Sequence, residues 1–466
     1  MKWHNRVAIT TLAGLTGGRN GFYTQVGQAV QSRVGAFDST QTVIPLGCAM
    51  LSLDGNTGTT SIEFHFTEPL EKSASLLRAW LTWLGLHFNP FQPLDASADA
   101  RLSDYLVEHH ILATIWGDWH SFVFAPAGGG KTALRMRTSQ LCWVGQATNH
   151  PFPISYLPPF LIWRHTHPSR DEHLEALAQA GAIRLLLALV YRPHWFLELR
   201  PLDQQAVYQS LVWNLPGNLN FWLSQVEESQ SIAPLLDIFD PTFILPDPPN
   251  AFVLQQLCNS LRAQSAKAIA LPDPIERWNH LVDVLLRILG FRAIYILIDG
   301  LDAVQETATD VKTAVECLAT LLPLIDEWQT QPLFIKGYLP QDTRDYLTAR
   351  FPSLVTHAQT ATIQWTPALL AEVVRRRVYV ASEGAFGSLD AIASPAIRDL
   401  ETVLAKIAFP LPREMLVLTQ RVLVEHINRF GATGIIQPED VDAALAWYQA
   451  QHPTASHVAQ PIVQTL

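Results

Sequence analysis

Five mostly apolar runs recur in the middle of the chain, each bounded by turn-forming or polar residues. They cover residues 120–124 (HSFVF), 151–163 (PFPISYLPPFLIW), 293–298 (AIYILI), 332–338 (PLFIKGY) and 361–365 (ATIQW). Apolar runs of this kind are typical of strands buried on both faces of a sheet. Stretches with helical spacing, such as 310–328, lie between them. Alternating strands and helices predict an α/β fold with a parallel sheet.

Two other parts of the chain show helical patterns without strand signals. Residues 171–286 predict helices broken by proline-rich loops, and therefore a helical insertion within the α/β core. Further on, proline follows Thr366, Ser394, Leu411 and Gln437, which places it in or near a first helical turn where its missing N–H costs nothing. We therefore predict an N-terminal extension of unknown role (1–75), the core (76–365), a four-helix lid (366–451) and a tail (452–466).

The overall composition narrows the class of protein. Of 466 residues, 48% are hydrophobic and 16% charged, and the net charge is −10, so the chain is expected to be globular and a poor general polyanion binder. The longest apolar stretch, 182–191, is interrupted by Arg184 and is too short for a membrane span. We expect no signal peptide, and the four dispersed cysteines indicate neither a zinc site nor a disulfide framework. These features predict a cytoplasmic protein.

A glycine-rich segment follows the first apolar run and precedes a helical stretch, which is the context of a phosphate-binding loop. Its residues are Ala125, Pro126, Ala127, Gly128, Gly129, Gly130, Lys131 and Thr132. Glycines let backbone N–H groups turn towards phosphate, and the helix N-terminus adds favourable partial charge. Lys131 would contact the β- and γ-phosphates, and the Thr132 hydroxyl would bind Mg²⁺. Ala125 replaces the first glycine of GxxxxGK[ST], which is tolerable where its φ is negative.

Two acids follow the most apolar run. Asp299 lies at the tip of that predicted strand, where a carboxylate would hold Mg²⁺ directly or through water. Asp302 lies three residues further on and would orient or deprotonate an attacking water. The alternative for each of them is a helix-capping role. Together with the glycine-rich loop they predict a binding site for a nucleoside triphosphate and Mg²⁺.

The segments APAGGGKT and AIYILIDGLD together resemble the P-loop NTPases of the additional-strand class, specifically the signal-transduction (STAND) and AAA+ branches. The resemblance covers roughly residues 85–450. It implies a P-loop NTPase core, ATP as ligand and ATP hydrolysis. STAND proteins usually continue the second segment as DGLDE, whereas Ala303 stands at the final position here. The resemblance therefore leaves Asp302 as the second acid and implies slow hydrolysis.

The same resemblance suggests roles for three basic residues. Lys336 would be the polar sensor on the strand beside the site, or else a lysine whose stem is buried and whose amine reaches water. Arg350 would be an arginine finger for a neighbouring subunit, or else a helix-end arginine complementing the dipole. Arg413 would be the second sensor, reaching the γ-phosphate from the lid, or else part of a surface ion pair.

Three functions remain open at this point. The first is an ATPase switch that acts through self-association or a protein partner. The second is an AAA+ regulator bound to DNA, suggested by the Asn-Pro-Phe segment at 89–91 and disfavoured by the net charge and the few lysines. The third is a nucleotide-binding scaffold without hydrolysis. ATP is favoured over GTP because no N-K-x-D motif is present, and neither G-x-S-x-G nor HExxH occurs.

Overall fold

The computed structural model describes residues 68–143, 150–157, 167–231, 233, 235–236, 249–264, 271–303, 305–308 and 310–452. The predicted N-terminal extension lies largely outside these residues, and so does the predicted tail apart from His452. The end of the predicted strand at 151–163 lies outside them as well.

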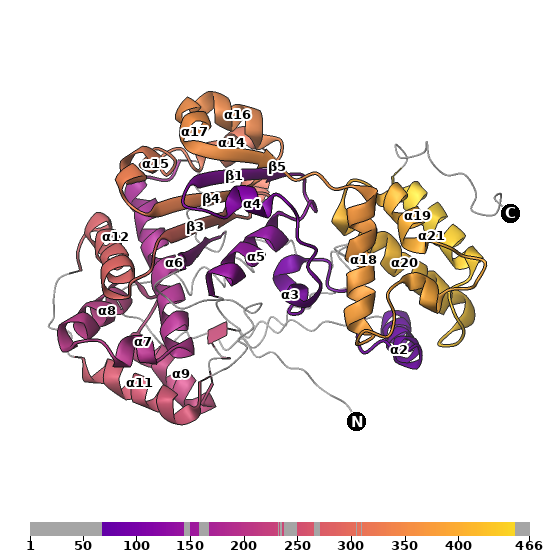
Figure 1. Cartoon of the computed structure of the whole chain (residues 1–466), viewed down its shortest axis with the longest axis horizontal. Coiled ribbons are helices and arrows are strands. Elements are labelled where there is room, and N and C mark those ends of the chain that lie inside the picture. Colours follow the sequence, from indigo (N-terminus) through magenta and orange to yellow (C-terminus); the bar gives the residue numbers. More distant parts are fainter. Residues whose placement is uncertain are drawn as a thin grey trace, which may run out of the picture.

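Five parallel strands form one sheet, which confirms the predicted α/β class (Figure 1). The strands are β1 (His120–Ala125), β2 (Phe152–Tyr156), β3 (Ile294–Asp299), β4 (Leu333–Pro340) and β5 (Ala358–Thr362). Their spatial order is β2-β3-β4-β1-β5, so β4 lies between β1 and β3. The last strand begins three residues earlier than its apolar run predicted, and Trp365 lies beyond it.

Alternating side chains of the strands pack into two different cores. On β3, Ile294, Ile296 and Ile298 enter a large core together with helices that include α6 (Arg170–Tyr191) and α12 (Pro274–Asp283). The intervening Tyr295 and Leu297 face a smaller core that includes residues of α4 (Leu112–Ile115) and α5 (Lys131–Trp143). Helices thus cover both faces of the central strands, which explains why β3 is apolar up to its final aspartate. The edge strand β5 (AQTAT) is partly exposed and more polar.

The predicted helical insertion lies between β2 and β3, and its first helix belongs to the sheet packing. Besides α6 and α12 it contains α7 (His194–Leu197), α8 (Pro201–Asn214), α9 (Leu219–Ser229), α11 (Ala251–Ala263) and a π-helical turn, Val284–Ile288. Within the described residues, α6 alone is long and apolar enough to cross a membrane, and 78% of its most apolar stretch is buried inside the protein. This burial identifies α6 as a core helix, which is compatible with a soluble protein.

Short helices complete the core. Before β1 lie η1 (Ala96–Ala98) and the single-turn helix α3 (Leu102–Tyr105). After β3 come α13 (Gln305–Ala308), α14 (Val311–Glu316), α15 (Leu324–Glu327) and η5 (Trp328–Thr330), where one long helix was predicted. After β4 lie α16 (Thr343–Arg350) and α17 (Pro352–His357).

The C-terminal part is helical, as the proline pattern predicted. It contains α18 (Pro367–Ala381), η6 (Leu389–Ile392), α19 (Leu400–Ala408), α20 (Pro412–Phe430) and α21 (Pro438–Gln451). Proline opens α18, α20 and α21, whereas α19 begins after Asp399 and not after Ser394.

A helix from the other end of the chain completes this module. Figure 1 shows α2 (Glu68–Trp83) beside α18 and α20, and Leu77, Trp80 and Leu81 pack into the same apolar core as the lid helices. The predicted boundary at residue 76 divided this helix equally between the N-terminal extension and the α/β core. The apolar face of α2 instead completes the lid.

Candidate functional site

The glycine-rich loop joins the carboxyl end of β1 to the first turn of α5. Gly128 and Gly130 adopt φ values of +76° and +93°, a backbone region that residues with a Cβ rarely enter. Gly129 closes a turn by donating its N–H to the Pro126 carbonyl at 3.0 Å. Ala125 ends the strand and is not among the residues with positive φ, so the condition for tolerating alanine there is met. The local conformation is that of a loop whose turns depend on glycine.

Lys131 is the first residue of α5 and is only 5% exposed. Its Nζ donates to the carbonyl oxygens of Ala125 at 3.0 Å and Pro126 at 3.1 Å. The same ammonium lies 2.8 Å from Asp302 Oδ2, whose side chain is partly exposed. The predicted phosphate ligand and the predicted second acid therefore form an ion pair at the carboxyl edge of the sheet.

Asp299 is buried at the end of β3 and binds a partner that sequence reasoning missed. Its Oδ2 accepts from Arg135 Nε at 3.1 Å, and Oδ1 accepts from the Gly300 N–H at 2.8 Å. Burial raises the pKa of Asp299 above its usual range, while Arg135 and a hydrogen bond from Thr132 oppose the rise. Arg135 follows Lys131 by one helical turn and therefore lies on the same face of α5. The four-residue spacing of Lys131 and Arg135 was the feature of the sequence from which the role of Arg135 could have been predicted.

A cavity of about 320 Å³ lies over the loop, which is within the usual size range of small-molecule sites. Polar groups of the loop, the acid-bearing segment and the lid line one part of it, including Lys131, Thr132, Asp302 and Arg413. Apolar side chains line the rest, including Leu106, Val107, Trp365, Val373 and Leu416. The cavity is thus lined by both charged and apolar side chains.

Residues from the lid side contact the outer side of the loop. Arg413, in the first turn of α20, is exposed towards the cavity, and its N–H lies 3.4 Å from the Gly128 carbonyl. The indole of Trp365 donates to the Gly129 carbonyl at 2.9 Å. Arg413 therefore lines the cavity from the lid, and its role as the second sensor stays a prediction. No sequence pattern pointed to the contact of Trp365.

The sensor role expected of Lys336 is wrong. The register pairs Lys336 with Ser121, at the beginning of β1, four residues before the strand ends at Ala125. Its side chain is completely buried, and Nζ donates to the carbonyls of Ile115, Gly117 and Trp119 at 2.6–2.8 Å. Neither a snorkelling lysine nor a sensor fits this geometry. Lys336 binds the turn before β1 at the opposite end of the sheet.

Arg350 is half-exposed at the end of α16 and does not line the cavity. Its Nε lies 3.1 Å from Glu316 Oε1, and this contact lowers the pKa of Glu316 against the effect of burial. Within one chain, Arg350 is therefore a helix-end arginine with an acidic partner. A role towards a neighbouring subunit remains a prediction.

The basic cluster on α18 is used within the protein. Arg376 pairs with Glu372 at 2.9 Å. Arg377 is buried, where it pairs with Asp99 at 3.0 Å and donates to the Pro90 carbonyl at 2.8 Å. This face of α18 is thus only partly exposed to solvent. Arg377 instead ties the lid to the segment that precedes β1.

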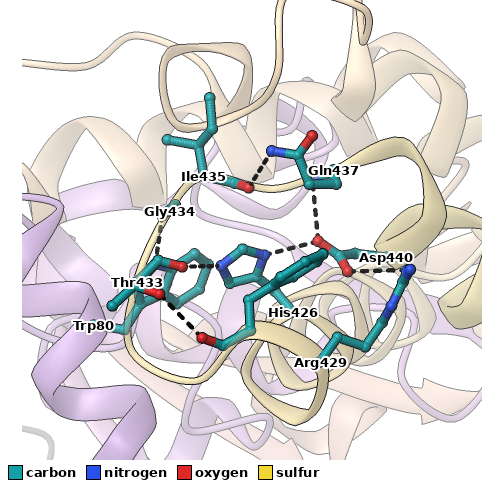
Figure 2. Close-up of polar contacts among 9 residues, drawn as sticks. Trp80, His426, Arg429, Thr433, Gly434, Ile435, Gln437 and Asp440 are labelled. Atoms are coloured by element: carbon teal, nitrogen blue, oxygen red, sulfur yellow. Dashed lines mark hydrogen bonds and ion pairs between the residues drawn. The ribbon is translucent and has the colours of Figure 1, made fainter.

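A histidine and an aspartate form a second buried polar cluster in the lid (Figure 2). His426 Nδ1 lies 2.7 Å from Asp440 Oδ2, while Nε2 lies 2.9 Å from the Thr433 carbonyl. Trp80 stacks on the imidazole with ring centroids 4.4 Å apart. Both ring nitrogens are occupied and the pair is buried, so no position for a reacting atom is left. The cluster joins α2, α20 and α21.

The donors available for Mg²⁺ fit the predicted ion. Among the described residues, no group of three or more His, Cys, Asp or Glu side chains could hold a metal. A nucleotide-bound Mg²⁺ needs fewer protein ligands, because phosphate oxygens and waters supply the rest. The Thr132 hydroxyl and the Asp299 carboxylate share a hydrogen bond and so converge on one position. These two oxygens are the groups that would hold the ion.

The described residues define an α/β protein with a five-stranded parallel sheet, a charged cavity at its carboxyl edge and a helical module beside that cavity. No family model matches the chain, and neither a curated protein nor a solved structure matches it. A function can therefore be proposed only from the fold and from the geometry of the cavity.

Proposed function

We propose that the protein is a Mg²⁺-dependent ATP-binding and hydrolysing switch of the STAND/AAA+ type, acting through self-association or a protein partner. One observation carries this proposal. A glycine-rich loop, the buried Lys131 and the segment after β3 that carries Asp302 enclose one cavity together with Arg413 of the lid. This set supplies backbone donors, a cation and metal ligands to a polyphosphate.

The sheet topology supports the assignment to the additional-strand class. In that class an extra strand separates the strand of the phosphate loop from the strand of the metal-binding acid. Here β4 lies between β1, which leads into the loop, and β3, which ends in Asp299. The apolar lining of the cavity supports a nucleotide over inorganic phosphate as the ligand.

A switch needs two states, and the ion pairs of the site indicate how ligand binding would change one into the other. In the structure Lys131 pairs with Asp302, and Arg135 pairs with Asp299. A bound triphosphate would attract Lys131 away from Asp302, and Mg²⁺ would compete with Arg135 for Asp299. When bound, the ion supplies positive charge that stabilises phosphate oxygens. The triphosphate and Asp302 would thus alternate as partners of Lys131, and Mg²⁺ and Arg135 would alternate as partners of Asp299, which is the differential interaction that shifts a population.

The proposal is tested by nucleotide affinity and ATP hydrolysis of the wild type, Lys131→Ala and Asp299→Ala, each over a protein concentration series with Mg²⁺. Loss of Lys131 should weaken affinity by roughly 10- to 100-fold, the effect of about 1.5–3 kcal/mol for a charge-assisted hydrogen bond. Asp299→Ala should abolish the Mg²⁺ dependence. Lys312→Ala, on the exposed side of α14, is the matched control for loss of a lysine. A wild type that binds no nucleotide would refute the proposal.

The dependence on protein concentration tests self-association separately. A rate per subunit that rises with concentration is expected if Arg350 acts on a neighbouring subunit, and Arg350→Ala should then remove most of the rate. Because Arg350 is half-exposed and Glu316 keeps its hydrogen bond from the Tyr346 hydroxyl, the free energy of unfolding should change by less than about 1 kcal/mol. A rate independent of concentration and of Arg350 would exclude the finger.

A second candidate function is a nucleotide-binding scaffold without turnover. Two observations favour it: Ala303 occupies the position of the usual glutamate, and Asp302 is engaged by Lys131. Tight binding of ATP with no phosphate release at any protein concentration would select this alternative. The DNA-bound regulator is less supported, because Arg376 and Arg377 are both engaged with acidic side chains.

A further inference from the structure

The segment that connects the sheet to the lid contacts the phosphate loop directly. Residues 363–366 join the end of β5 to the start of α18, and Trp365 is half-buried within them. Its indole Nε1 donates to the Gly129 carbonyl at 2.9 Å. The next carbonyl towards the N-terminus, that of Gly128, lies 3.4 Å from the Arg413 N–H. Two successive carbonyls of the loop are therefore contacted from the lid side.

The planarity of the peptide bond gives the Trp365 contact a consequence inside the cavity. The Gly129 carbonyl and the Gly130 N–H belong to one peptide unit and point in opposite directions across its plane. A hydrogen bond that holds the Gly129 carbonyl towards Trp365 therefore directs the Gly130 N–H away from Trp365. Gly130 lines the cavity, and its N–H is one of the loop donors expected to face phosphate.

The indole is held firmly in this position. His109 Nε2 lies 2.9 Å from the Gln364 carbonyl, and the His109 ring meets Trp365 edge to face with centroids 5.4 Å apart. A Cβ at Gly130 would lie 3.3 Å from the indole, which is tighter than most side-chain contacts. The loop and the connecting segment are thus closely fitted, so a movement of one displaces the other.

We propose that Trp365 is a positioning residue for polyphosphate binding, which orients the Gly129–Gly130 peptide and couples the lid to the phosphate loop. This inference rests on the proposed function, since it names the element that prepares the same cavity for phosphate. The ligand portion that it concerns is the polyphosphate chain. A nucleoside would contact the apolar lining of the cavity, which includes the Trp365 ring, and would not depend on the indole N–H.

The test compares Trp365→Phe with the wild type by isothermal titration with inorganic triphosphate, adenosine and ATP. Phenylalanine keeps an aromatic ring and removes the N–H donor. One hydrogen bond contributes about 0.5–1.5 kcal/mol, so affinity for triphosphate and ATP should fall by roughly 2- to 10-fold while affinity for adenosine stays unchanged. Trp119→Phe is the matched control, because Trp119 Nε1 donates to the Thr114 carbonyl at 2.8 Å away from the cavity.

A second measurement needs no ligand. Hydrogen exchange of the peptide covering residues 126–133 should become faster in Trp365→Phe and stay unchanged in Trp119→Phe, because only the first loses a bond to the loop. Equal triphosphate affinity in Trp365→Phe and wild type would overturn the inference, as would a parallel loss of adenosine affinity. If the wild type binds triphosphate and ATP, these outcomes leave the proposed function standing; if it binds neither, the proposed function fails first.

Discussion

Two buried lysines lie at opposite ends of the same sheet, and their surroundings differ in kind. Lys131, at the carboxyl ends of the strands, contacts two carbonyls and the carboxylate of Asp302 beside a cavity. Lys336, towards the amino ends, contacts three carbonyls and no carboxylate. Its ammonium also lies 4.6 Å from the centroid of the Tyr295 ring.

The comparison shows that burial alone does not distinguish a candidate site lysine from a structural one. Lys131 has a partner that is partly exposed and can be replaced by a ligand of the same charge. Lys336 is enclosed by backbone groups, which have no alternative partner, and burial lowers its pKa to about 7. A buried cation with an exchangeable partner beside a cavity indicates a site, whereas a cation enclosed by carbonyls indicates a structural contact.

The largest expected effect concerns the acid at the carboxyl end. Arg135→Met leaves the buried Asp299 without its cationic partner and should reduce the free energy of unfolding by about 3–5 kcal/mol. Urea denaturation monitored by circular dichroism measures this change. Arg135→Met combined with Asp299→Asn should recover much of the loss, because the unpaired charge is then removed. A loss below about 1 kcal/mol in the single variant would contradict a tightly paired buried acid.

The next effect concerns the amino end. Lys336→Met leaves the carbonyls of Ile115, Gly117 and Trp119 without their donor, while it removes the cost of burying the amine. Since one unsatisfied buried group costs about 1–3 kcal/mol, we expect a net loss of about 2–3 kcal/mol. Nucleotide affinity should remain that of the wild type. A specific loss of ATP hydrolysis without a loss of stability would restore a sensor role to Lys336.

The smallest effect, counted per pH unit, is the dependence of stability on pH. In the unfolded chain the pKa of Lys336 is about 10.4, so above pH 7 the unfolded state binds a proton that the folded state has released. Stability from this group therefore rises with pH, by up to about 1.4 kcal/mol per unit between pH 7 and 9. The difference between wild type and Lys336→Met isolates the effect from other groups. Parallel profiles would mean that the three carbonyls retain the proton.

Local sequence patterns were sufficient to predict the α/β class, the approximate position of the strands and the glycine-dependent turns of the loop. Apolar runs without alternation identify strands covered on both faces, and Gly128 and Gly130 adopt the positive φ that glycine permits. These features depend on neighbours in the chain. The helices of the lid were predictable for the same reason, except that α19 has no proline at its start.

Which residues meet at the site depends on tertiary contacts that the sequence patterns do not specify. The register of β4 against β1 placed Lys336 at the far end of the sheet, although its strand was predicted correctly. The Arg135–Asp299 pair, the contact of Trp365 with Gly129 and the docking of α2 on the lid all join residues remote in sequence. Local periodicity specifies which face of an element is apolar. It carries no information on the register, the order of strands or the distant partner that satisfies a buried charge, because those depend on packing of the whole chain.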